Sequence, residues 1–268
     1  TENVTITNCQ VTAFDPGTFL DGTFGRTQQQ APDRDGPTGR IKLGTESNGG
    51  FKNITISNCV FDHSRGLALE SVDGGSIEDI AITNITMRDV TTAPIFLRLG
   101  KRLRAPEGTA VGAIRRVQIS NIIVSDAEPR FASIIAGLPD HPIEDVLLSN
   151  IRIQYRGGGT KEQAALDPPE KETSYPEPSM FGDIPAYGFF VRHVRGIQMH
   201  HINVQYMKDD QRPAFIFDDV KSADLWNIKA QNNTGISTFL LKNVEDFHIG
   251  SSWPVNDTYI DRADRKLF

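Results

Sequence analysis

The 268-residue sequence predicts an all-β chain that forms one right-handed parallel β-helix, a solenoid with about three strands in each coil. Two observations predict it. A ten-residue pattern, in which two alternating strands flank one Asn, recurs along the chain, and helical periodicity is nearly absent. Such self-similarity marks a solenoid in which each coil buries its apolar face against its neighbours. We therefore expect a single domain over residues 1–268.

The copies of the pattern appear in order along the chain. They are ENVTITNCQV at 2–11, KNITISNCVF at 52–61, EDIAITNITM at 78–87, RRVQISNIIV at 115–124, EDVLLSNIRI at 144–153 and the looser GIQMHHINV at 196–204. A third short apolar run lies between copies, as GRIKLG, GLALES, APIFLRLG, ASIIAGL, YGFFVRHV and PAFIFDDV. Because short strands of a solenoid pair with the same strand of the next coil, we expect parallel sheets in register.

One Asn position recurs in five copies. An Asn tolerates the left-handed backbone of a tight turn, and its amide can bond the Asn of the coils above and below. The alternative is N-glycosylation, but Asn84 would then have to serve both as ladder member and as acceptor. A ladder is therefore the preferred interpretation of Asn8, Asn58, Asn84, Asn121 and Asn150, over sequons at Asn3, Asn53, Asn84, Asn232 and Asn256.

Composition excludes several classes of function. A net charge of −6 gives no electrostatic footprint for nucleic acid, and no long apolar run predicts a membrane span. Cys9 and Cys59 hold the same place in two copies, so we interpret them as stacked core thiols rather than a disulfide. No metal-ligand spacing appears, and we expect no cofactor and a monomer. Thr1 opens directly onto a strand, so a signal peptide, or more of the chain, is expected to be missing.

Alternation along the third strand places charged residues in one outward row. The row comprises Lys42, Glu70, Arg98, Arg192 and Asp218, with Asp21 at its start. Adjacent coils lie about 4.8 Å apart, so charges of alternating sign there would form a salt-bridge ladder. A groove lined by the same charges would instead hold an anionic sugar, and the sequence leaves both interpretations open.

Residues 156–186 interrupt the repeat with Gly, Pro and charged residues, and loops this long are usually functional or disordered. The segment offers Tyr175, Glu177, Met180 and Phe181, with Tyr187 just beyond it, and we expect it to form a wall of the binding groove. The alternative is a lid packed over an apolar edge. His141 and His193 are more commonly turn or strand residues than catalysts, although His193 lies near the expected groove.

Three stretches carry a resemblance to a known family: LGTESNGGFKNITISNC, APIFLRLG and the run from YPEPSMFG to PAYGFFVRH. Together and in this order they resemble the C-terminal part of polygalacturonase-type enzymes, family 28 of the glycoside hydrolases, in its bacterial branch. The resemblance implies inverting hydrolysis of α-linked uronic acid chains in pectin. In that mechanism, one carboxylic acid protonates the leaving oxygen and another carboxylate activates water.

The chain departs from the family pattern at the catalytic residues. It contains no Asn-Thr-Asp, and its Asp209-Asp210 and Asp218-Asp219 pairs come too late in the sequence. We expect the catalytic aspartates to lie upstream of Thr1, and we assign no catalytic residue here. Residues 40–42 spell the family's Arg-Ile-Lys. Their flanking residues, however, more closely resemble the family's coil that carries Gly-His-Gly. In that register Thr38 lies near the family's histidine, and residues 68–70 stand in place of Arg-Ile-Lys.

The sequence thus predicts an extracellular or periplasmic glycoside hydrolase that acts on pectic polysaccharide or oligosaccharide, although this chain alone is expected to be inactive. Two alternatives remain: a polysaccharide lyase on the same fold, and a non-catalytic carbohydrate-binding β-helix. The candidate substrate-binding residues are Arg40, Lys42, Glu70, Arg98, Glu177, Tyr187, Arg192 and His193.

Overall fold

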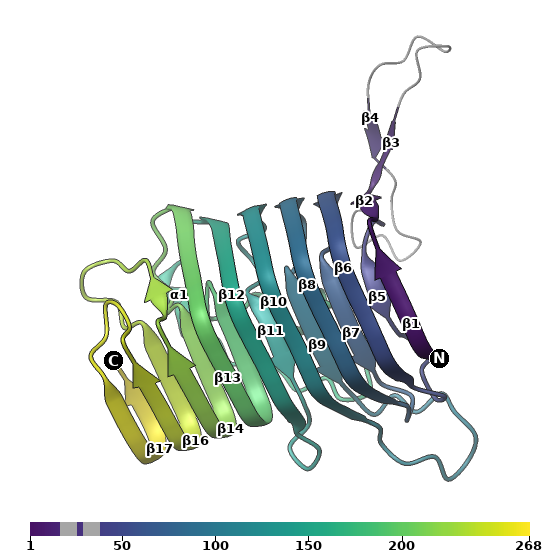
Figure 1. Ribbon diagram of the computed structural model, residues 1–268. Helices are drawn as coiled ribbons and strands as arrows, with labels where there is room; N and C mark the ends of the chain where they lie inside the picture. The colour runs from purple at the N-terminus through teal and green to yellow at the C-terminus, as the bar shows by residue number, and fades with distance from the viewer. Residues whose placement is uncertain (17–25, 29–37) are drawn as a thin grey trace.

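Parallel strands wind around one axis to form a β-helix (Figure 1). The computed structural model describes residues 1–16, 26–28 and 38–268, so the expected position of Asp21 lies outside the described residues. The short strands are β3 (Phe14–Pro16), β4 (Arg26–Gln28), β5 (Ile41–Leu43), β7 (Leu67–Ser71), β9 (Ile95–Leu99), β11 (Ser133–Ala136) and β15 (Lys229–Ala230). The others are β1 (Glu2–Thr7), β2 (Gln10–Thr12), β6 (Phe51–Ser64), β8 (Ser76–Val90), β10 (Ala113–Ala127), β12 (Ile143–Gly157), β13 (Phe189–Lys208), β14 (Phe215–Trp226), β16 (Phe239–Gly250) and β17 (Thr258–Leu267).

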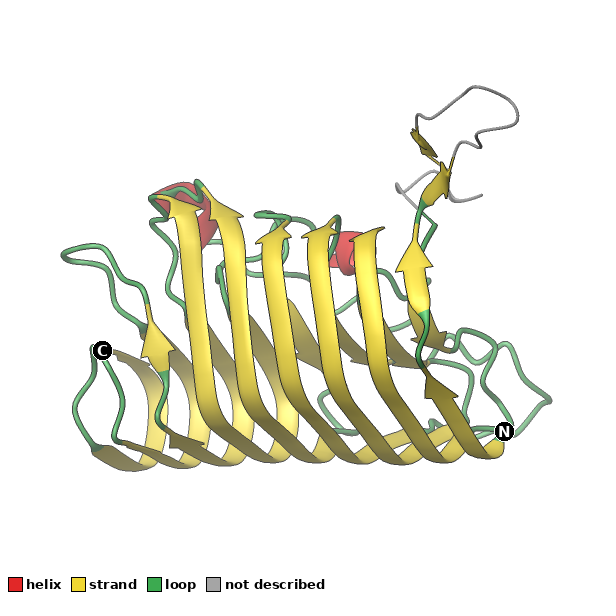
Figure 2. Cartoon of the chain, turned by 45° about the horizontal axis from the view of Figure 1, so that its top comes forward, coloured by secondary structure: helices red, strands yellow, loops and turns green. Residues whose placement is uncertain are grey.

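Successive coils pair in register, as the repeat predicts. One series of parallel pairs runs β1-β6-β8-β10-β12-β13, and a second joins β13 to β11, β9, β7 and β5. Strand β13 takes part in both, since its start pairs with β11 and its remainder with β12. Figure 2 shows the strands of neighbouring coils stacked side by side along the axis. The predicted parallel β-helix is therefore confirmed.

The repeated Asn forms the predicted ladder. Asn58, Asn84, Asn121 and Asn150 all have φ between 53° and 56°, the left-handed region that Asn tolerates. The amide of Asn84 donates to Asn58 Oδ1 (3.2 Å), that of Asn121 to Asn84 Oδ1 (3.2 Å) and that of Asn150 to Asn121 Oδ1 (2.7 Å). The two strand segments around each Asn consequently form one long strand with a bend.

Inward-facing side chains stack in rows through the coils. Ile54, Ile80, Val117, Val146 and Ile197 form one such row, and all five are buried. A different inward row, towards the C-terminal end, is aromatic, with ring centroids 5.7 Å apart for Phe189 and Phe215, 4.8 Å for Phe215 and Phe239, and 5.1 Å for Phe239 and Phe268. Burial of this apolar surface, at about 25 cal/mol per Å², stabilises each coil only when its neighbour is present.

A second apolar cluster lies on the outward face of the short strands. Its row is Ala68, Phe96, Ile134, Phe190, Ile216 and Leu240. Phe181 of the 3-10 turn η1 (Pro178–Phe181), with Ile184 and Ala186, packs against this row. Helix α1 (Lys161–Ala164) belongs to the same segment. Residues 156–186 therefore cover the apolar outward positions of these strands as a lid, the alternative interpretation, and do not stand beside an open groove there.

The two cysteines are free thiols, as predicted. Cys59 is buried and Cys9 half-buried, and the amide of Val60 donates to the carbonyl of Cys9. At the C-terminal end, β17 pairs with β16 in antiparallel fashion, unlike the coils before it. None of the helices described is long and apolar enough to span a membrane.

Candidate functional site

The strand register tests the expected row of charges. Glu70 pairs with Arg98, Arg98 with Ala136, Ala136 with Arg192, and Arg192 with Asp218. Lys242 of the next coil continues the row. Lys42 pairs instead with Ala68, two residues before Glu70, so its backbone does not belong to this row. The row is thus present from Glu70 to Asp218. Lys42 reaches it only through its side chain, which pairs with Glu70.

Glu70 is the centre of a buried ionic cluster. Its side chain is fully buried, with Lys42 Nζ 2.7 Å from Oε2 and Arg40 Nη1 3.6 Å from Oε1. The hydroxyl of Thr45 also donates to Oε2. Burial raises the pKa of Glu70 to about 6, while the charges of Lys42 and Arg40 oppose that rise. The carboxyl group therefore titrates closer to neutrality than an ordinary glutamate.

Glu177 brings the covering segment into this cluster. Its Oε1 accepts hydrogen bonds from Arg40 Nη1 (2.7 Å) and Arg65 Nη1 (3.0 Å), and only 3% of the residue is exposed. Nε and Nη2 of Arg40, and Oε1 of Glu70, are buried without a hydrogen-bond partner in the structure as described. Arg40 therefore holds two carboxylates together while one edge of its guanidinium stays unpaired.

Tyr175 presents an exposed ring beside this cluster, with 46% of the residue accessible. Its hydroxyl accepts a hydrogen bond from Lys42 Nζ (3.2 Å) and lies 3.4 Å from the Thr45 hydroxyl. Lys42 Nζ lies 5.0 Å from the ring centroid and Arg102 Cζ 5.8 Å from it. Tyr175, Lys42, Thr45 and Arg102 are called the Tyr175 surface below. It joins one aromatic ring to two cations.

Arg102 is a buried cation, although it lies in a stretch with two further basic residues, Lys101 and Arg104. Its side chain is 5% exposed and forms an ion pair with the buried Asp73. Although burial raises the pKa of Asp73, the hydrogen bond from Arg102 and the backbone of Arg104 lower it overall. Asp73, in the coil turn before Arg102, was the available sequence signal for this ion pair, because a buried aspartate requires a cationic partner.

Arg98 and Arg192 are buried beneath residues 156–186. Arg98 donates to the carbonyls of Gly137 and Glu170, and its guanidinium lies 5.2 Å from the Phe181 ring centroid. Burial lowers the pKa of Arg98 to about 10, partly opposed by Glu170. Arg192 donates to Asp218 Oδ2 (3.0 Å), the Pro168 carbonyl and Glu170. Both arginines therefore hold the covering segment instead of lining an open groove.

His193 and Tyr187 also lie in closed environments. His193 Nδ1 is 2.6 Å from Asp219 Oδ2 and its Nε2 is 3.1 Å from Glu170 Oε1. Tyr187 is 2% exposed in the main core, 5.2 Å from the Tyr206 ring, and donates to the Gln231 carbonyl. The expected groove-lining position of Tyr187 is wrong. Tyr187 lies two residues before the inward-facing Phe189, so strand alternation points it inward too. Sequence reasoning missed this signal.

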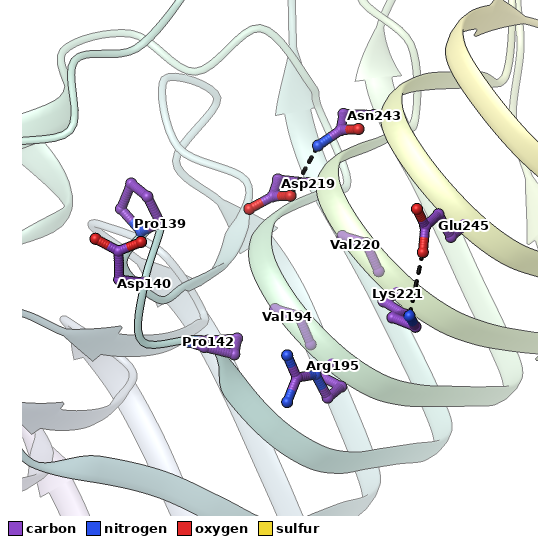
Figure 3. A pocket seen from close by; sticks show the side chains of 10 residues that line it. All are labelled: Pro139, Asp140, Pro142, Val194, Arg195, Asp219, Val220, Lys221, Asn243 and Glu245. Carbon is purple, nitrogen blue, oxygen red and sulfur yellow. Dashed lines mark hydrogen bonds and ion pairs between the residues drawn. The ribbon is translucent and has the colours of Figure 1, made fainter.

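A polar pocket of about 340 Å³ lies beside the bend that follows the charged row (Figure 3). Asn243 donates to Asp219 Oδ1, and Lys221 forms an ion pair with Glu245 along one wall. Pro139, Asp140 and Pro142 form the other side. Besides the pair of Lys221 and Glu245, Arg195 pairs with Glu144 and Asp219 with His193, both outside the pocket lining.

The described residues contain no group of three or more His, Cys, Asp or Glu side chains that could hold a metal ion. The Tyr175 surface brings an exposed aromatic ring next to the cationic groups of Lys42 and Arg102. Comparison with protein-family models, curated proteins and solved structures found no match to the chain.

Proposed function

We propose that this chain is the substrate-holding β-helix of a polygalacturonase-type glycoside hydrolase and binds an acidic pectic glycan at the Tyr175 surface. The observation that carries the proposal is the exposed Tyr175 ring, which lies close to the cationic groups of Lys42 and Arg102. An aromatic face packs against the apolar face of a sugar ring, and a cation pairs with its carboxylate. Such polymers lie outside the cytoplasm, so the proposed location is extracellular or periplasmic.

Ionisation of Glu70 sets the charge that this surface offers. At neutral pH the Glu70 carboxylate holds Lys42 at 2.7 Å, and Arg102 is held by Asp73. A bound uronate would share both cations with these carboxylates. The positive charge is therefore oriented before substrate arrives, which lowers the entropy lost on binding.

The proposed reaction is hydrolysis with inversion. It requires one carboxylic acid and one carboxylate about 6.5–9.5 Å apart, with water between them. The sequence has neither aspartate motif of the family at the expected place, so we assign binding, and no proton transfer, to its residues. Turnover of oligogalacturonide by the 268-residue chain alone is accordingly expected to be undetectable.

Calorimetric titration with oligogalacturonide tests the binding proposal. We expect Lys42→Met and Tyr175→Ala each to weaken binding by about 1.5–3 kcal/mol, the scale of a hydrogen bond to a charged group. Lys221→Met is the matched control, because Lys221 is exposed and paired with Glu245 elsewhere on the helix. Equal affinity of all four proteins, or equal affinity for acidic and neutral oligosaccharides, would contradict the proposal.

The rival lyase is tested through the product. Elimination creates a C=C bond that absorbs in the ultraviolet, whereas hydrolysis releases a reducing end without one. An enzyme that contains this β-helix is expected to release reducing ends at constant ultraviolet absorbance. A rise in absorbance during digestion would assign the chain to the lyases.

A further inference from the structure

A separate pocket of about 400 Å³ lies between the covering segment and the turns that lead into β9 and β11. Thr91 belongs to the first turn, Glu128, Arg130 and Phe131 to the second, and Glu177 and Ser179 to the segment. We call it the Thr91 pocket. It shares no residue with the Tyr175 surface and no function has been assigned to it above.

Glu177 offers an oriented acceptor to this pocket. Its Oε1 is occupied by Arg40 and Arg65, at 2.7 and 3.0 Å. The hydrogen bonds described for this carboxylate both end on Oε1, which leaves Oε2 for a ligand donor. Since only 3% of Glu177 is exposed and its carboxylate is fixed by two guanidinium groups, Oε2 is held in one position. A ligand donor in the pocket would meet a preorganised carboxylate oxygen.

The charges around the pocket argue for a neutral ligand. Glu177 is compensated by Arg40 and Arg65, and Arg130 Nε lies 3.0 Å from Asp183 Oδ1. Glu128 lies 3.5 Å from Arg156. A bound anion would be repelled by the carboxylates of Glu177 and Glu128. A bound cation would compete for these carboxylates with the guanidinium groups that already pair with them. A neutral ligand avoids both costs of burying an unpaired charge.

Hydroxyl groups are the donors that suit these acceptors. A hydroxyl donates one hydrogen bond and accepts others, so a polyhydroxylated ring can bond Glu177 and Glu128 and also accept from Arg130. The Thr91 hydroxyl donates to the Ser64 carbonyl and retains lone pairs for a ligand donor. The pocket volume lies within the range of small-molecule sites.

We propose that the Thr91 pocket binds one neutral sugar unit through hydroxyl hydrogen bonds to Glu177 and Glu128. This inference goes beyond the acidic-glycan site and stands on the pocket alone. The chemistry of the two sites differs: the Tyr175 surface selects negative charge, and the Thr91 pocket selects uncharged hydroxyl donors. The two proposals can therefore fail independently.

Saturation-transfer NMR of the intact chain with galactose, rhamnose and galacturonate tests the inference. We expect a neutral sugar to bind the wild type, and Glu177→Gln to raise its Kd about tenfold, the loss of one hydrogen bond to a charged group. Ser179→Trp should abolish binding by filling the pocket, because Ser179 is exposed and lines it. Thr55→Trp, on the exposed face of β6, is the matched control and should bind as the wild type.

Tyr175→Ala separates the two sites. It should retain neutral-sugar binding while losing galacturonate. Absence of saturation transfer to both neutral sugars, unchanged binding in Ser179→Trp, or competition by galacturonate for the pocket would each overturn the inference. Loss of neutral-sugar binding in Tyr175→Ala would place the sugar at the Tyr175 surface and overturn it as well.

Discussion

Glu70 is a carboxyl group whose burial outweighs two neighbouring cations. An exposed pair with Lys42 would favour ionisation, yet the folded-state pKa is raised to about 6 because the carboxylate is removed from water. The fully buried carboxylate therefore carries a stability cost at neutral pH that depends on its charge.

We predict that this cost is visible as a pH dependence of unfolding. Between its ordinary value of 4.5 and about 6, Glu70 binds protons more tightly in the folded than in the unfolded chain. The free energy of unfolding should consequently fall as pH rises through this window, by on the order of 2 kcal/mol. Glu70→Gln should remove that component, as measured by urea unfolding at several pH values.

The exposed Glu245→Gln is the control for this measurement and should keep the wild-type slope. A slope that is the same in the wild type and Glu70→Gln would show that Glu70 binds protons equally tightly in the folded and the unfolded chain. Both variants retain the charge of Lys42 and Arg40, so the comparison concerns the slope and not the absolute stability.

Sequence reasoning identified the charged residues better than their environments. Alternation correctly placed Glu70, Arg98 and Arg192 on one outward row, since strand geometry is local. Their burial depends on where residues 156–186 lie, which no repeat determines. Tyr187 is the exception, because its inward direction follows from Phe189 and was open to prediction.

The Asn ladder is the element that fixes the bend in each long strand. Asn121 donates to Asn84 and accepts from Asn150 while holding φ at 55°. Asn121→Ala should lower the free energy of unfolding by about 2–3 kcal/mol, because it loses ladder hydrogen bonds and places Ala in the left-handed region. Thermal and urea unfolding measure the change.

Asn121→Gly separates the two contributions. Gly accepts the left-handed backbone without strain, so the variant should lose only the hydrogen-bond part and remain more stable than Asn121→Ala. If the Ala and Gly variants are equally stable, the backbone conformation contributes nothing at this bend.

The covering segment is the second element, and Arg192 is its main tie. Arg192 reaches the Pro168 carbonyl, Glu170 and Asp167 from beneath. Arg192→Met should release residues 165–173 and raise their amide hydrogen exchange by at least about tenfold, since local opening loses several hydrogen bonds to a charged group. Amides of β8 and β10 should exchange at wild-type rates.

Arg195→Met is the control for the segment, because Arg195 follows closely on the same strand but is exposed and paired only with Glu144. Faster exchange throughout the helix in Arg192→Met would assign the arginine to global stability. Exchange of residues 165–173 at the wild-type rate would show that the apolar contacts of Phe181 hold the segment without it.

The whole molecule ends in a strand of reversed direction. β17 pairs with β16 in antiparallel fashion, and the Phe268 ring stacks 5.1 Å from Phe239 over the last coil. Deletion of residues 257–268 should expose Phe239 and Phe247 and leave β16 with a free edge. We expect the truncated chain to associate, as seen by size-exclusion chromatography and increased binding of an apolar dye.

A point variant keeps this prediction testable if the truncated chain fails to fold. Phe268→Ala retains β17 but removes the stacked ring, and it should raise dye binding without creating a free edge. A monomeric truncated chain with wild-type dye binding would show that β17 does not protect the end of the helix.

The ladder has a consequence for how such a chain can change its length. The coils that carry Asn58, Asn84, Asn121 and Asn150 meet through the same Asn position, although Asn58 and Asn84 are 26 residues apart and Asn84 and Asn121 are 37 apart. The additional residues lie in the connections, outside the paired strands. A duplicated or deleted stretch that spans one whole ladder interval therefore restores every row of the interior, whereas one that ends within a strand shifts the rows out of alignment. Length in this architecture varies in units of a coil, and insertions of arbitrary size are confined to the connections.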